Sequence, residues 1–158
     1  MPWIYFDDAD RQSPAPAFNL ERLPDGGRLA LGDFYEQSAL VLIFLPDSAK
    51  PFELSLAPFS RRFSDYHAQN AQLLAILPGK ISVPEAPFPV LADPDGQTRA
   101  AYAALLAAEL LPEEYSALFV LDVYGAPWAA YTAPRLDDPN LPDELLSWVS
   151  YIGIQCPE

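Results

Sequence analysis

Three short runs of apolar residues along the chain have the pattern of buried strands. Residues 39–45 are continuously apolar and lie between Ser38 and Pro46, and residues 72–77, which are apolar after Gln72, and residues 89–92 also have the pattern of buried strands. Such runs are typical of strands that helices cover on both faces. The pattern therefore predicts a central sheet between two helical layers.

A face with helical spacing follows the first of these strands. Its members recur at intervals of four, three, four and three residues and are Phe52, Leu56, Phe59, Phe63 and Tyr66. We expect the helix to begin near Ser55 as its N-cap, because this places Pro58 in the first turn, where its missing N–H is harmless. Residues 47–54 are then expected to form a loop.

Two further helices are predicted in the second half of the chain. Residues 97–111 are rich in alanine and leucine, which favour helix, and Pro112 ends the stretch. A terminal helix is predicted between an N-cap at Asn140 and Gly153. Its apolar face is Leu141, Leu145, Trp148 and Ile152.

Turn residues predict two hairpins. Residues 18–21 and 28–31 flank a turn rich in proline and glycine, and residues 117–122 and 128–132 flank another. The order is then hairpin, strand, helix, strand, strand, helix, hairpin, helix. It predicts an α/β fold with a central mixed sheet and helices on both faces.

Composition fits a single domain. The chain has 158 residues, 51% of them hydrophobic, and its 18 prolines divide it into short elements. We assign residues 1–13 to an N-terminal lead-in and residues 14–158 to one domain. The amino end lacks the pattern of a secretory signal, and no apolar run is long enough for a membrane span, so we expect a cytoplasmic protein.

Charge and cysteine content exclude several classes of function. A formal net charge of −13 disfavours nucleic acid and anionic membranes as partners. One cysteine and one histidine cannot supply the ligands of a structural zinc site, and one thiol cannot close a disulfide within the chain. We expect no metal and no cofactor.

Several motifs follow one another in a suggestive order over residues 14–132. They are Ala15-Pro-Ala-Phe-Asn-Leu20, Asp25-Gly26, Leu31-Gly-Asp-Phe34, Val41-Leu-Ile-Phe-Leu-Pro46, Phe88-Pro-Val-Leu-Ala-Asp-Pro-Asp-Gly96 with Ala101-Tyr102, and Leu118-Phe-Val-Leu-Asp122 before Gly125. Together they resemble the peroxiredoxin group, the alkyl hydroperoxide reductase and thiol-specific antioxidant (AhpC/TSA) branch of the thioredoxin-fold superfamily. The resemblance implies a three-layer thioredoxin-like fold with an N-terminal hairpin.

The resemblance also locates the family's active loop, which reads Pro, three residues, Thr or Ser, two residues, and the peroxidatic Cys. Counting from Pro46, the Thr position falls on Lys50 and the Cys position on Glu53. The position of the family's arginine, three residues before Phe119, falls on Ser116. A carboxylate cannot become a sulfenic acid, and without the arginine the cation that depresses a nucleophile's pKa is absent.

Other polar residues have a functional and a structural interpretation. His67 is either a general base or a histidine at a helix end, and no nucleophile stands in a visible relation to it. The acids Asp7, Asp8 and Asp10, and Asp137 with Asp138, either bind a cation or are solvated charge. The structural interpretation is favoured in both cases, and the stripe of Phe52, Phe59 and Phe63 is favoured as core.

Cys156 is the chain's single thiol, in the terminal sequence Ile154-Gln-Cys-Pro-Glu158. It is a candidate redox thiol that would act with a partner thiol, and the alternative is an incidental residue. The active loop that follows Pro46 has no Cys-x-x-Cys motif.

These observations lead to three hypotheses. The first is a degenerate peroxiredoxin-like protein that serves as a non-catalytic binding or interaction module, and the second is a thiol oxidoreductase that works through Cys156. The third is a small-ligand pocket made of Pro46, Lys50, Glu53 and Ser116. The expected partner is a protein or a second copy of the chain. Four aromatic residues either contact this partner or belong to the hydrophobic core: Trp3, Tyr5, Phe6 and Trp128.

Overall fold

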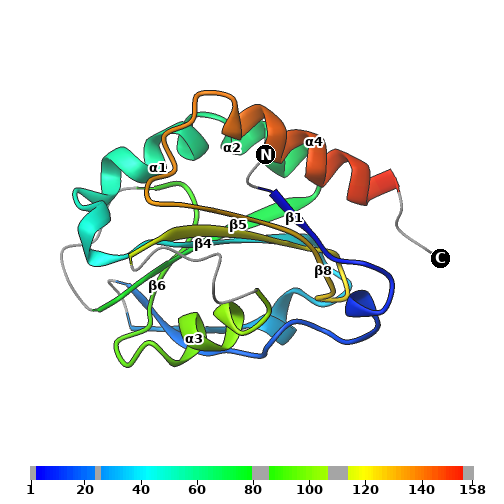
Figure 1. Ribbon diagram of the computed structural model, residues 1–158, viewed down its shortest axis with the longest axis horizontal. Coiled ribbons are helices and arrows are strands. Elements are labelled where there is room, and N and C mark those ends of the chain that lie inside the picture. The colour runs from blue at the N-terminus through cyan, green and yellow to red at the C-terminus, as the bar shows by residue number, and fades with distance from the viewer. Residues whose placement is uncertain (1–2, 24–25, 80–85, 107–113, 155–158) are drawn as a thin grey trace.

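The computed structural model describes residues 3–23, 26–79, 86–106 and 114–154. Within these residues one mixed sheet of eight strands runs through the molecule in the order β1-β8-β7-β4-β5-β6-β2-β3 (Figure 1). The strands are β1 (Trp3–Tyr5), β2 (Asn19–Leu23), β3 (Arg28–Ala30), β4 (Ala39–Phe44), β5 (Ala71–Leu77), β6 (Val90–Ala92), β7 (Ser116–Leu121) and β8 (Pro127–Ala133).

The pairing of these strands confirms the predicted sheet and both hairpins. The central strands β4, β5 and β6 are parallel, and β7 pairs antiparallel with β4. The hairpins β2–β3 and β7–β8 extend the sheet on either side, with β2 antiparallel to β6. All residues of β4 and β7 are buried, as expected of strands covered on both faces.

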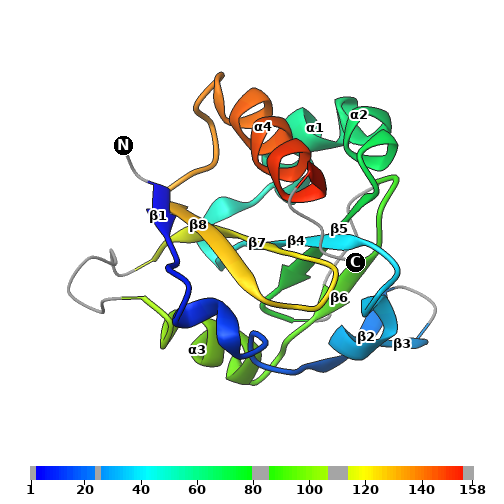
Figure 2. The same cartoon turned by 90° about the vertical axis from the view of Figure 1, so that its right-hand side faces the viewer.

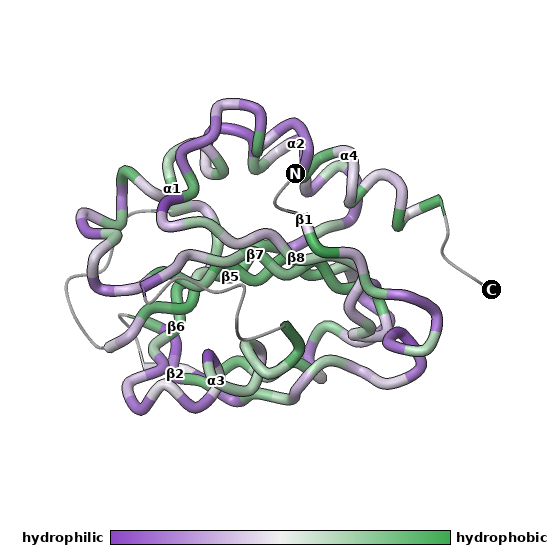
Figure 3. The backbone as a smooth tube through the Cα atoms, in the orientation of Figure 1, coloured by the Kyte–Doolittle hydropathy of each residue, from purple (hydrophilic) through white to green (hydrophobic). Residues whose placement is uncertain are grey.

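Helices cover the two faces of the sheet (Figures 1 and 2). One face carries α1 (Phe52–Arg61), α2 (Phe63–Ala68) and α4 (Leu141–Ile154), and the other carries α3 (Gln97–Ala103) together with the N-terminal segment. Short 3₁₀ turns lie at Asp10–Gln12, Leu31–Phe34 and Asp47–Ala49. Apolar strands lie between the layers (Figure 3), and each face has its own buried cluster. The α/β thioredoxin-like architecture is confirmed.

The predicted start of α1 is wrong. The helix begins at Phe52, not near Ser55, so residues 52–54 are helical and Pro58 lies in the helix interior. The side chain of Ser55 does not cap the helix, because its hydroxyl donates to the carbonyl of Ala49 at 3.1 Å. Pro58 removes one hydrogen bond to the carbonyl of Leu54, and since Leu54 is exposed, water can replace that bond.

The other two helices differ from the predictions at their ends. α3 ends at Ala103 instead of residue 111. Backbone hydrogen bonds between residues three positions apart then form a turn that reaches Leu106, whose side chain is buried. Residues 107–111 lie outside the described residues. α4 continues past Gly153 to Ile154, and its buried row is Leu141, Leu145, Val149 and Ile152 rather than one that includes Trp148.

The predicted lead-in contributes to the sheet. Trp3–Tyr5 form β1, which pairs antiparallel with β8 at one edge of the sheet. Trp3 and Phe6 are buried in the core, Tyr5 is exposed, and Trp128 is half-buried. The four aromatic residues singled out in the sequence therefore divide between core and surface.

Candidate functional site

The loop between β4 and α1 leaves the carboxyl end of the central strand, where open α/β sheets place their ligand sites. Pro46 follows the strand and is buried, and Asp47–Ala49 form a 3₁₀ turn. The Lys50–Pro51 peptide bond is cis, and Pro51 directly precedes α1. This geometry places position 53 in the first turn of the helix.

Glu53 and Lys50 both lie at the surface. Glu53 is exposed in the first turn of α1, where the helix dipole favours a carboxylate. The Lys50 ammonium lies 3.4 Å from a carboxylate oxygen of Asp47 and 5.9 Å from the ring centre of Phe52. Both side chains therefore have ordinary surface environments, a carboxylate at a helix start and a lysine beside a neighbouring acid.

Ser116 is fully buried at the start of β7. Its hydroxyl donates to the carbonyl oxygen of Pro134 at 3.2 Å, across the β7–β8 pair. Residues alternate along a strand, so Ser116 faces the same side of the sheet as Leu118, which is the side covered by α1 and α4. The position predicted for the family's arginine is thus a buried serine whose hydroxyl is already hydrogen-bonded.

Beside Pro46 is a hollow of about 310 Å³ that sequence reasoning did not anticipate. Its lining includes Pro46, Asp47, Asp93, Arg99 and Glu114, but not Lys50, Glu53 or Ser116. The pocket predicted from Pro46, Lys50, Glu53 and Ser116 therefore stays a prediction: only its first member lines this hollow.

Arg99 is the cation of this hollow, and its surroundings hold it in place. The guanidinium carbon lies 4.2 Å from the ring centre of Tyr115, and the guanidinium donates to the Tyr115 carbonyl. Burial lowers the pKa of Arg99, while Tyr115, Glu114 and Asp93 oppose that shift. Tyr115 and Glu114 are distant from Arg99 in the sequence, and Asp93 lies in the turn before the helix. The spacing of residues along the chain therefore could not predict this arrangement.

Asp93 fixes the start of α3 beside the hollow. The Asp93 carboxylate accepts hydrogen bonds from the backbone N–H groups of Thr98 at 3.2 Å and Arg99 at 2.9 Å. Gly96 precedes the helix with a φ of 71°, a left-handed conformation that glycine adopts readily. The carboxylate is therefore used to build the fold and is not free for chemistry.

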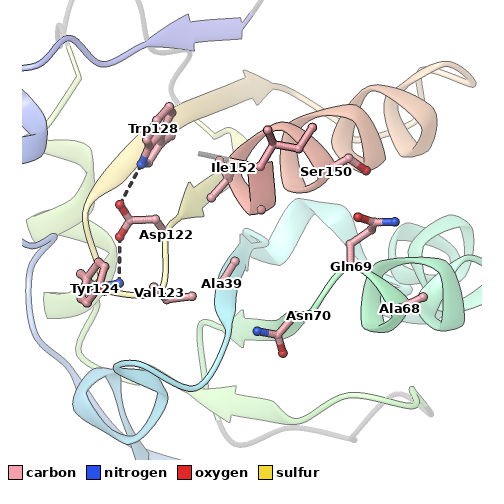
Figure 4. A pocket seen from close by; sticks show the side chains of 12 residues that line it. Ala39, Ala68, Gln69, Asn70, Asp122, Val123, Tyr124, Trp128, Ser150 and Ile152 are labelled. Carbon is pink, nitrogen blue, oxygen red and sulfur yellow. Dashed lines mark hydrogen bonds between the residues drawn. The ribbon is translucent and has the colours of Figure 1, made fainter. Parts of the chain in front are cut away.

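A second hollow, of about 440 Å³, opens at the other end of the sheet between α2, α4 and the β7–β8 turn (Figure 4). Figure 4 shows Gln69, Asn70 and Ser150 around it. Among the described residues that line it, the one carboxylate is Asp122, which accepts hydrogen bonds from the Trp128 indole at 2.9 Å and from the N–H groups of two turn residues. That carboxylate therefore stabilises the turn.

The remaining polar candidates have structural roles or lie on the surface. His67 is exposed in the last turn of α2, with its ring centre 5.9 Å from that of Phe63. Asp7 and Asp10 each accept the backbone N–H of the other, and the Asp10 N–H lowers the pKa of the Asp7 carboxyl. Within the described part of the chain, no group of three or more histidine, cysteine, aspartate or glutamate residues is arranged to hold a metal ion.

The phenylalanine stripe and the C-terminal region complete the account of the predicted residues. Phe52 and Phe59 are buried and Phe63 packs against the same cluster, so the stripe is core as predicted. Cys156 lies outside the described residues. None of the described helices is long and apolar enough to cross a membrane.

Comparison with known proteins identifies the family. The model of the AhpC/TSA family matches residues 12–126, which is well over half of the chain. The chain belongs to the AhpC/TSA family. No curated protein sequence matches this family member.

Solved structures similar to this AhpC/TSA protein include several peroxiredoxins. The mitochondrial 2-Cys peroxiredoxin of Plasmodium falciparum is 18% identical, with a TM-score of 0.70 over 89% of this chain and 92% of that chain. The reduced 2-Cys peroxiredoxin of Plasmodium vivax is 17% identical, with a TM-score of 0.72 over 92% and 86%. Thioredoxin peroxidase I of Plasmodium yoelii is 16% identical, with a TM-score of 0.71 over 92% and 95%. At these identities the likeness establishes the fold.

Proposed function

We propose that this AhpC/TSA-family protein is a non-catalytic binding or interaction module that keeps the fold of the family without its peroxidase chemistry. The observation that carries the proposal is Glu53, an exposed carboxylate in the first turn of α1, where the family's loop pattern has its cysteine. Peroxide reduction requires a thiolate that is oxidised to a sulfenic acid, and a carboxylate has no such step.

Ser116 supports the same proposal. The family's arginine stabilises the thiolate, and here its position is a buried serine whose hydroxyl donates to Pro134. A sulfur placed at position 53 would lack that cation, so its pKa would be less depressed. Loss of the nucleophile and of its activating charge point to the same conclusion.

The proposal is tested by peroxide consumption with a dithiol reductant, measured for the wild type and for Cys156→Ser. We expect both proteins to be inactive beside an active peroxiredoxin as the positive control. Turnover that disappears in Cys156→Ser would overturn the proposal and establish the alternative, a thiol oxidoreductase acting through Cys156. Turnover that persists in the variant would overturn both.

The third hypothesis, a ligand pocket at Lys50 and Glu53, has its own measurement. Saturable chemical-shift changes confined to the amides around Lys50 and Glu53, on titration with small polar metabolites, would support it. Changes around Arg99 instead would place the site in the hollow beside Pro46.

A further inference from the structure

We propose that the groove between β1 and α4 binds an extended basic segment of a partner protein, with an arginine or lysine side chain lying among the groove's aromatic rings. This inference rests on the proposed function and names the chemistry of the partner. The groove has a volume of about 450 Å³. It is lined by Trp3, Tyr5, Glu144, Ser147, Trp148 and Tyr151.

The aromatic rings form a connected cluster whose outer members face solvent. The ring centre of Trp148 lies 5.9 Å from that of Trp3, 5.5 Å from that of Tyr5 and 6.1 Å from that of Tyr151. Tyr5 is 64% exposed and Tyr151 is 49% exposed. Tyr5, Trp148 and Tyr151, three of the four rings that line the groove, stand at different inclinations and offer π faces of the kind that attract a cation.

Another member of the same ring cluster already holds a cation. Trp128 packs edge-on against Tyr151 at 5.8 Å, and the guanidinium carbon of Arg11 lies 4.3 Å from the Trp128 ring centre. The chain thus places its own Arg11 on Trp128, the ring beside Tyr151. The rings at the groove, Tyr5, Trp148 and Tyr151, stack on no cation of the described residues.

A carboxylate lines the groove, and further acidic residues act on the neighbouring Tyr131. Glu144 lies in it, and one of its oxygens accepts the Trp3 indole N–H at 2.8 Å, which orients the carboxylate beside the rings. Burial, followed by the charges of Asp138, Glu144 and Asp137, raises the pKa of Tyr131, whose ring packs 5.3 Å from that of Trp3. With a net charge of −13, the whole chain favours a cationic partner over an anionic one.

The sheet edge at the groove favours a peptide over a small free cation. β1 is the outermost strand of the sheet and lies beside α4 (Figure 2). The Phe6 N–H donates to Trp128 of the neighbouring β8, so by alternation the backbone groups of Trp3 and Tyr5 point away from β8. An extended segment can pair with this edge while alternate side chains reach the groove.

The test is titration of the full chain with a short peptide that alternates arginine and threonine, followed by the indole N–H signals of Trp3 and Trp148. A glutamate-for-arginine peptide, ethylguanidinium and tetramethylammonium are the comparison ligands. We expect saturable binding of the basic peptide only, weakened by added salt. No saturable binding of that peptide, or equally tight binding of ethylguanidinium or tetramethylammonium, would overturn the proposal.

Three variants locate the binding surface. Glu144→Gln removes the charge and keeps an acceptor for Trp3, and Tyr151→Leu keeps apolar area without the π face. We expect each to weaken binding about three- to tenfold, whereas Glu53→Gln, a charge-matched change on α1, leaves it unchanged. Equal weakening by Glu53→Gln would show general attraction to an acidic protein and overturn the assignment, as would a dimer whose formation excludes the peptide.

The two proposals fail separately. Peroxide turnover would overturn the non-catalytic role and would leave the peptide titration unaffected. A peptide that does not bind would remove the groove as a docking surface, while the inactive loop around Glu53 would remain.

Discussion

Replacing Ser116 with arginine, the residue type that we propose the family has at this position, is expected to destabilise the protein strongly. Ser116 is fully buried, and its hydroxyl donates to Pro134 at 3.2 Å. The substitution loses that bond, worth about 1 kcal/mol, and overpacks a closed site at about 1–3 kcal/mol. Burying the charge without a partner costs several kcal/mol more, against a total of about 5–15 kcal/mol for a typical domain.

Urea unfolding followed by tryptophan fluorescence measures this effect, with Ser116→Met as the matched control. Methionine has a similar length without the charge, so the difference between the two variants isolates the cost of burying the guanidinium. We expect Ser116→Arg to be less stable than Ser116→Met by at least about 2 kcal/mol. Equal stability would mean that position 116 can still accommodate the family's arginine, and it would refute the interpretation of a closed site.

Further predictions concern the elements around the site. Asp93→Ala should lower the free energy of unfolding by about 2–4 kcal/mol in urea, because two backbone N–H groups lose a buried acceptor. Gly125→Ala should destabilise the wild type more than a Tyr35→Ala background, measured by thermal unfolding. In the wild type the new Cβ would lie 2.7 Å from the Tyr35 ring. Without that ring, only the strain of φ +79°, about 1–2 kcal/mol, would remain. Burial raises the pKa of Tyr66 and of Tyr102, so both favour the neutral folded form. The stability that these two tyrosines contribute should be fully present below about pH 10 and should be lost as the pH rises above it. The free energy of unfolding should fall less steeply in this pH range when both tyrosines are replaced by phenylalanine.

The fold followed from the sequence because its strands are patterned without ambiguity. Residues 39–45 are apolar throughout and residues 72–77 are apolar after Gln72, and β4 and β5 lie there with complete burial of β4. The helix ends were predicted less well. Intrinsic propensity favoured helix up to residue 111 and a start near Ser55, but α3 ends at Ala103 and α1 starts at Phe52. Local signals cannot report where tertiary packing ends an element.

The site was predictable only in part. Counting along the loop from Pro46 predicts the cysteine position at Glu53, and this stays a prediction; the structure shows that Glu53 lies in the first turn of α1. The hydrogen bond of Ser116 to Pro134 and the stacking of Arg99 on Tyr115 join residues 18 and 16 positions apart through the sheet and a turn, and no periodicity records such contacts.

The groove at β1 could not be predicted from the sequence either. Trp148 was assigned to the core row of α4 because it keeps the apolar spacing, yet the buried residue is Val149. A shift of one residue turns Trp148 toward Trp3 and Tyr5, and these lie in a segment that composition marked only as a lead-in. Once β1 pairs with β8, the aromatic residues of the two chain ends share one surface with Glu144. Residues from both ends of the chain therefore form one surface that neither segment predicts by itself.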